Sequence, residues 1–352
     1  MAPRACILGC AGTVLTGEER TFFRDADPWG FILFKRNIDA PEQVLALTTA
    51  LRECVGRSDA PILVDQEGGR VQRMGPPHWP AYPPGRAYGA LSANDPLTRR
   101  EAVRLGARLM AHDLRAVGIN VDCVPVADVP APGGHDVIGD RAYADTADEV
   151  ATLARAAAEG LLAGGVLPVI KHIPGHGRAS ADSHHELPRV DTSLEEMDAT
   201  DFAPFRTLSD MPMSMTAHVV YSATDPRHAA TLSRKVIKHV IRERLGFDGL
   251  IMTDDLGMKA LAGDLETLAA KALKAGCDMN LHCSGRLDEN RRVAAGSDRL
   301  KGHAKRRAHA ALARLVRTPE PLDEGEARAR FAALMSGAAR SAVADPTADG
   351  RR

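Results

Sequence analysis

The feature that most constrains the fold is a regular alternation of short apolar runs with amphipathic segments along the 352 residues. The runs are rich in β-branched residues and predict buried strands, while the segments between them have helical periodicity. Strands are predicted at 5–12, 30–34, 61–64, 119–128, 166–170, 213–219, 250–253 and 277–281. Helices are predicted at 16–26, 41–55, 96–117, 148–163, 193–208, 233–245, 265–275 and within 287–316. Eight such units favour an α/β fold of one domain, a (β/α)8 barrel of the TIM type, over an open doubly wound sheet.

Two details refine this prediction. Pro125 lies inside the fourth predicted strand, so a bulge or an early end is expected there. The barrel domain is assigned to residues 1–340, and residues 341–352, which are small and polar, are expected to form a frayed C-terminal tail.

Composition excludes several classes of function. Lysine and arginine number 45 and aspartate and glutamate 46, which gives a net charge of −1, and aromatic residues make up only 4%. Neither a nucleic acid nor a membrane surface is therefore an expected partner. The six cysteines show no CxxC spacing, and the sequence contains no signal peptide and no apolar run of the roughly 18 residues that span a bilayer. A cytoplasmic location follows as the expectation. No heptad pattern or self-complementary patch indicates an oligomeric state, and a monomer is taken as the expectation.

Chemically active residues cluster where the predicted strands end. In a parallel barrel the carboxyl ends of all strands meet at one mouth, so residues at these positions converge. The residues at or just after the ends of these strands are Asp65, Lys171, His172, His218, Asp254 and His282.

The densest cluster is the loop after the fifth strand, which reads KHIPGHG from Lys171 and continues with DSHHELP from Asp182. Zinc is disfavoured because Pro174 and Gly175 prevent His172 and His176 from sharing a helix face, and no HExxH motif occurs. A histidine that transfers protons beside a carboxylate fits better. No metal or cofactor is therefore expected.

A second carboxylate site follows the seventh strand, in Thr253-Asp254-Asp255. Neighbouring residues of a strand point in opposite directions, so only one aspartate readily faces the mouth. Asp254 is predicted to face it, and Asp255 is predicted to begin the next helix as an N-cap.

These motifs resemble a known family. KHIPGHG followed by DSH, VDQEGGRVQR at 64–73, and the segment 246–258, which contains TDD at 253–255, are similar to signatures of glycoside hydrolase family 3. More narrowly, they resemble the bacterial β-N-acetylhexosaminidases of peptidoglycan recycling. The arginine in IGDRAY, Arg141, also matches. One departure is Gly177-Arg178-Ala179-Ser180, where relatives often carry Asp-Thr after the last glycine.

The resemblance implies a retaining β-N-acetylglucosaminidase. Asp254 would be the nucleophile, His184 the general acid/base and Asp182 the residue that orients His184. The sugar would be bound by Asp65, Arg73, Arg141, Lys171 and His172. The substrate implied is a carbohydrate, the N-acetylglucosaminyl-anhydromuramyl peptide of the cell wall.

Three alternatives remain open. A phosphorylase could use the same site, because a histidine acid/base repels phosphate less than a carboxylate does. A muropeptide-binding barrel without catalysis would not need Asp254, Asp182 and His184 together. Metal-assisted hydrolysis would be dismissed by activity that survives a chelator.

Overall fold

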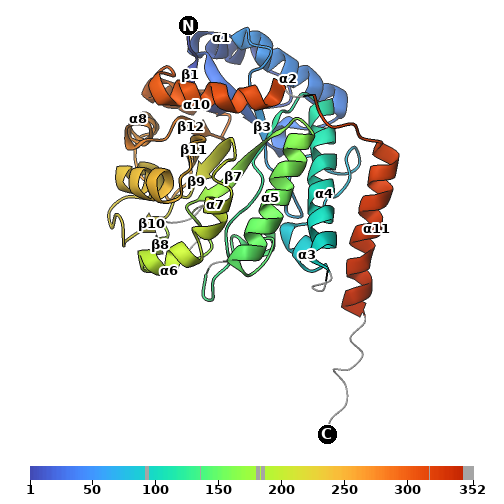
Figure 1. The fold of residues 1–352 in the computed structure, drawn as a ribbon. Helices are drawn as coiled ribbons and strands as arrows, with labels where there is room; N and C mark the ends of the chain where they lie inside the picture. The colour runs from blue at the N-terminus through green and yellow to red at the C-terminus, as the bar shows by residue number, and fades with distance from the viewer. Residues whose placement is uncertain (92–94, 135, 180–182, 184–186, 317, 344–352) are drawn as a thin grey trace.

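The computed structural model describes residues 1–91, 95–134, 136–179, 183, 187–316 and 318–343. Eight parallel strands close into a barrel in the order β1, β12, β11, β9, β7, β6, β3, β2, and helices surround it (Figure 1). The strands are β1 (Arg4–Gly9), β2 (Pro28–Leu33), β3 (Ile62–Val64), β6 (Val121–Asp122), β7 (Leu167–Ile173), β9 (Met213–Thr216), β11 (Leu250–Asp255) and β12 (Met279–His282). The predicted (β/α)8 barrel is confirmed.

The surrounding helical segments follow the strands in turn. They are α1 (Gly17–Ala26), α2 (Pro41–Val55), α4 (Pro96–Ala116), α5 (Ala147–Ala163), α6 (Leu194–Ala199), α7 (Ala203–Thr207), η4 (Val236–Arg244), α8 (Leu265–Ala275), α9 (Leu287–Gly296), α10 (Gly302–Ala313), η5 (Arg314–Val316) and α11 (Glu324–Val343). The short pieces are β4 (Gln66–Gly68), β5 (Val71–Gln72), β8 (Arg189–Val190), β10 (Val220–Tyr221), α3 (Gly85–Gly89), η1 (Lys35–Asn37), η2 (Gly139–Arg141) and η3 (Ala230–Leu232).

Apolar side chains form two layers, as the strand and helix periods require. One layer fills the barrel interior and includes Ile7, Leu63, Val169, Met213 and Met252. The other lies between the strands and the helices. The alternation read from the sequence thus buries one set of side chains inside the barrel and the other beneath the helices.

Helix starts follow local chemistry. Thr16 caps α1 in a full capping box with Glu19. The predicted N-cap at Asp255 is wrong, because α8 begins ten residues later at Leu265, where Asp264 accepts a hydrogen bond from the Thr267 N–H.

One helix prediction needs correction, and one strand prediction is confirmed in part. The single helix expected at 193–208 is divided into α6 and α7, and Pro204 opens the second piece, where its missing N–H costs no helical bond. The strand expected at 119–128 pairs regularly only over β6, which confirms the early end expected near Pro125.

The C-terminal part of the chain packs against α4. Helix α11 runs beside α4 (Figure 1), and Arg328 donates to Asp113, which also accepts from the Tyr82 hydroxyl. The helix extends to Val343, three residues into the predicted tail, and the rest of that tail, 344–352, lies outside the described residues. No helix in the described part of the chain is long and apolar enough to cross a membrane.

Candidate active site

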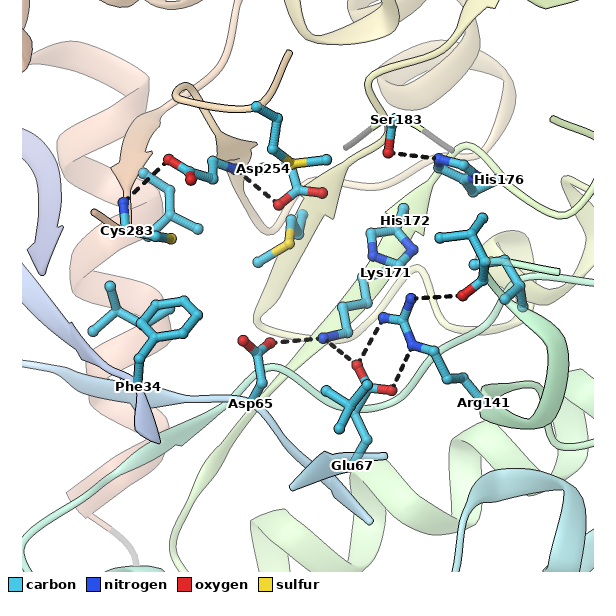
Figure 2. A pocket seen from close by; sticks show the side chains of 18 of the residues that line it. Phe34, Asp65, Glu67, Arg141, Lys171, His172, His176, Ser183, Asp254 and Cys283 are labelled. Carbon is cyan, nitrogen blue, oxygen red and sulfur yellow. Dashed lines mark hydrogen bonds and ion pairs between the residues drawn. The ribbon is translucent and has the colours of Figure 1, made fainter. Parts of the chain in front are cut away.

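A cavity of about 270 Å³ opens at the carboxyl ends of the barrel strands (Figure 2). Six of the eight sequence-predicted site residues line it, namely Asp65, Arg73, Arg141, Lys171, His172 and Asp254. The other two, Asp182 and His184, lie outside the described residues. Ser183, which separates them in the sequence, is described and also lines the cavity. The barrel therefore brings together residues from positions 65 to 254, as convergence at the mouth requires.

One side of the cavity is a row of alternating charges, which we call the charged wall: Arg73, Asp65, Lys171, Glu67 and Arg141. The Lys171 Nζ lies 2.9 Å from Asp65 and 2.7 Å from Glu67. Arg73 pairs with Asp65 at 3.1 Å, and Arg141 donates from Nε and Nη2 to the two oxygens of Glu67, each at 2.8 Å. Two carboxylates thus bind three cations.

The wall remains ionised although it is buried. The Lys171 side chain is only 2% exposed. Burial opposes its charge, but Asp65 and Glu67 outweigh burial and raise its pKa above the ordinary value. Burial likewise raises the pKa of Glu67, yet Arg141 and Lys171 bring that pKa down to about 2. Lys171 and Arg73 hold the pKa of Asp65 well below its ordinary value against the same effect of burial.

The hairpin of β4 and β5 places the first half of the wall. Gln66 closes the hairpin, because its side-chain oxygen accepts the N–H groups of Arg73 and Met74. Gly68 has a φ of 93°, and a Cβ there would lie 2.2 Å from the Pro83 carbonyl oxygen. Only glycine fits this turn, which explains the glycine beside Glu67 in the motif.

His172 is held by a carboxylate, Asp128, that no sequence motif singles out. Asp128, which is fully buried, accepts from the His172 ring Nδ1 at 2.7 Å and from the backbone N–H groups of His172 at 3.1 Å and His176 at 2.7 Å. Because an ionised carboxylate only accepts, Nδ1 carries a proton and Nε2 is the other polar atom of the ring.

Asp254 and Asp255 have different partners. The Asp254 Oδ1 accepts from the Asp255 N–H at 2.8 Å. Asp255 instead accepts from the N–H groups of Gly257 and Cys283 and pairs with His282 at 3.1 Å. Asp255 therefore organises the turn after β11, and among the described residues Asp254 is the cavity carboxylate without a basic side chain as partner.

Ser183 is held by two hydrogen bonds. Its hydroxyl lies 3.1 Å from the His176 Nε2, and its carbonyl accepts from the Ala260 N–H at 3.2 Å. Burial, and then the neighbouring His172, lower the pKa of His176 to about 4, so this ring is neutral at physiological pH. Within the described part of the chain, no group of three or more His, Cys, Asp or Glu residues is arranged to hold a metal ion.

Sequence reasoning missed Glu67, Asp128 and His176 as members of the site. Glu67 and His176 lie inside the motifs VDQEGGRVQR and KHIPGHG, so the motifs indicated these positions but gave neither residue a role in the site. Asp128 was included in a predicted strand, and nothing in its surroundings pointed to His172, which is 44 residues away.

Comparisons with known proteins agree with this architecture. The model of the glycosyl hydrolase family 3 N terminal domain matches residues 16–318. A beta-hexosaminidase of Bordetella parapertussis is 40% identical over 288 residues, which are 81% of each chain. A beta-hexosaminidase of Alkalilimnicola ehrlichii is 42% identical over 284 residues, 79% of this chain and 80% of the relative.

A solved structure extends the similarity to nearly the whole chain. NagZ from Neisseria gonorrhoeae, in complex with N-trifluoroacetyl-D-glucosamine, is 31% identical and superposes with a TM-score of 0.81. The match covers 96% of this chain and 99% of the other. The chain therefore belongs to glycosyl hydrolase family 3, and within that family it groups with the bacterial β-N-acetylhexosaminidases.

Proposed function

We propose that the protein removes a non-reducing terminal N-acetylglucosamine from muropeptides of the cell wall, in the cytoplasm, with retention of anomeric configuration. The observation that carries the proposal is the contrast among the cavity carboxylates. Asp65 and Glu67 are neutralised by the cations of the charged wall, and Asp255 accepts N–H groups in the turn after β11. Asp254 faces the cavity with only a backbone N–H as partner. A carboxylate that is not neutralised by a cation is the one suited to attack an anomeric carbon.

The size of the cavity supports an enzyme that acts on chain ends. Its volume of about 270 Å³ is just below the range of roughly 300–1,000 Å³ typical of pockets for drug-sized ligands. One sugar ring fits such a space better than several. Asp254 lies across the cavity from Asp65 and Lys171 (Figure 2), so a ring bound through its hydroxyls to the wall would present its opposite side to Asp254.

The proposed reaction has two steps. An Asp254 oxygen attacks the anomeric carbon, the bond to the leaving oxygen breaks, and His184 donates a proton to that oxygen. Water then attacks the same carbon, His184 takes its proton, and the bond to Asp254 breaks. Asp182 would accept from the His184 ring and stabilise its charged form. These two roles are carried over from the family motif.

The test is release of 4-nitrophenol from 4-nitrophenyl N-acetyl-β-glucosaminide by the wild type, Asp254→Ala and His184→Ala. The wild type is expected to turn over, and both variants to lose activity by a factor on the order of 10³ or more. A folded wild type that binds N-acetylglucosamine without turnover would refute the proposal. Faster turnover with phosphate, giving a sugar 1-phosphate, would make the protein a phosphorylase.

A further inference from the structure

Glu67 is the least exposed carboxylate of the charged wall, and its side chain is only 6% exposed. Its Oε1 accepts from the Arg141 Nη2 at 2.8 Å and from the Lys171 Nζ at 2.7 Å, and its Oε2 accepts from the Arg141 Nε at 2.8 Å. Figure 2 shows Glu67 between these two cations at the edge of the cavity. Both oxygens are therefore occupied by charged donors, which leaves Glu67 unsuited to transfer a proton.

Arg141 depends on Glu67 for its orientation. It ends η2, a single 3-10 turn, so no long element fixes its side chain. Glu67 takes its Nε and Nη2 donors, and the Val137 carbonyl takes Nη1 at 3.3 Å. Since a guanidinium has five N–H groups in a rigid fork, this arrangement leaves two N–H groups at fixed positions. The ammonium of Lys171 likewise keeps one N–H beyond its bonds to Asp65 and Glu67.

We infer that Glu67 is a positioning residue for sugar binding: it holds Arg141 and Lys171 so that their remaining N–H groups face the substrate. The inference rests on the proposed function, because it assigns Glu67 a part in binding the same sugar. Without the carboxylate, the wall would carry three cations and one anion, and Arg141 and Lys171 would repel each other without a shared partner.

A simpler role for Glu67 would be to tie the 136–141 loop to the hairpin. Arg70, on the same hairpin, already ties that loop from outside the cavity. Its Nε donates to Asp140 at 2.8 Å and its Nη2 donates to the Val137 carbonyl at 2.9 Å, and the pair with Asp140 is about half exposed. Arg70→Ala therefore removes a tie to the loop and leaves the charged wall intact, which makes it the matched control.

The experiment compares kcat and KM for 4-nitrophenyl N-acetyl-β-glucosaminide, the Ki of N-acetylglucosamine and the thermal midpoint in the wild type, Glu67→Gln, Glu67→Asp and Arg70→Ala. Removing one partner of a buried charge pair is expected to lower kcat/KM about 100-fold in Glu67→Gln. KM and Ki should rise together while kcat falls less. Arg70→Ala should stay within roughly threefold of the wild type.

Glu67→Asp keeps the charge but shortens the side chain, so it should recover part of the binding lost in Glu67→Gln. It also carries the test if Glu67→Gln melts below the assay temperature, and a KM near the wild-type value would then refute the inference. Near-normal KM and Ki in folded Glu67→Gln, or an equal loss in Arg70→Ala, would refute it as well. Either result would refute only the positioning role of Glu67, because the proposed function stands as long as the wild type is active. An inactive wild type would refute the proposed function and the positioning role together.

Discussion

Replacing Asp128 by Asn tests whether the cavity needs a defined form of the His172 ring. In the wild type the carboxylate accepts from the ring Nδ1 at 2.7 Å through Oδ2, while Oδ1 accepts two backbone N–H groups. An asparagine keeps those backbone bonds only if its oxygen takes the place of Oδ1. Its NH2 group then faces Nδ1, which must become an acceptor, so the proton moves to Nε2.

The expected loss follows from the bond that is exchanged. A hydrogen bond to a charged group contributes about 1.5–3 kcal/mol, which corresponds to a fall of roughly 10- to 150-fold in kcat/KM. Steady-state kinetics on 4-nitrophenyl N-acetyl-β-glucosaminide measures the loss, and ¹⁵N NMR of the His172 ring identifies the protonated nitrogen. The reasoning fails if NMR shows the proton on Nε2 and the kinetic constants remain within twofold of the wild type.

Asp278→Asn is the control for this experiment. Asp278 is also buried and accepts a backbone N–H, from Ile251, together with a guanidinium N–H from Arg242. It precedes β12 and therefore lies at the end of the barrel opposite the cavity. We expect this variant to lose stability but to keep the KM of the wild type. An equal change of KM in both variants would mean that the effect of Asp128 is a general loosening of the barrel.

Two further predictions concern stability. The pKa of Glu67 is about 2 in the folded chain against an ordinary 4.5, so the contribution of its charge to stability is complete above pH 4.5 and is lost as the pH falls towards 2. In urea unfolding, the free energies of unfolding of the wild type and Glu67→Gln should therefore converge between pH 4.5 and 2. A difference between the two free energies that stays constant over this range would contradict the assignment to the Glu67 charge. Gly68→Ala should lower the free energy of unfolding by about 2 kcal/mol or more, because its Cβ would meet the Pro83 carbonyl oxygen at 2.2 Å. Gly56→Ala, with a φ of 61° and open space, should lose less in the same measurement.

The fold was predictable because it is encoded in local patterns. Helices 41–55 and 265–275 have the predicted bounds, and each has a local start signal, Pro41 in the first turn and Asp264 as N-cap. The errors also have local causes. Pro204 divides the helix predicted at 193–208, and Asp255, a good N-cap by type, instead accepts N–H groups of its own turn and of the neighbouring strand end.

Part of the cavity lining was predictable from the sequence, but the pairings within it were not. Asp65, Lys171 and Asp254 could be placed at the mouth because each follows a strand. The bond between Glu67 and Arg141 spans 74 positions, and no pattern at either end identifies the partner. Pairing across such separations is decided by the register and tilt of the closed barrel, which local periodicity does not encode.

The packing of α11 connects the C-terminal part of the chain to the wall of the cavity. Arg328 binds Asp113, Asp113 binds the Tyr82 hydroxyl, and the Tyr82 carbonyl accepts the Gly69 N–H in the hairpin that carries Glu67. These contacts act in series, so removing α11 would leave a buried carboxylate without its cation and free one side of the hairpin. Shortening the chain at its C-terminus would therefore loosen the hairpin that carries Glu67, and we expect it to weaken binding of the proposed sugar substrate.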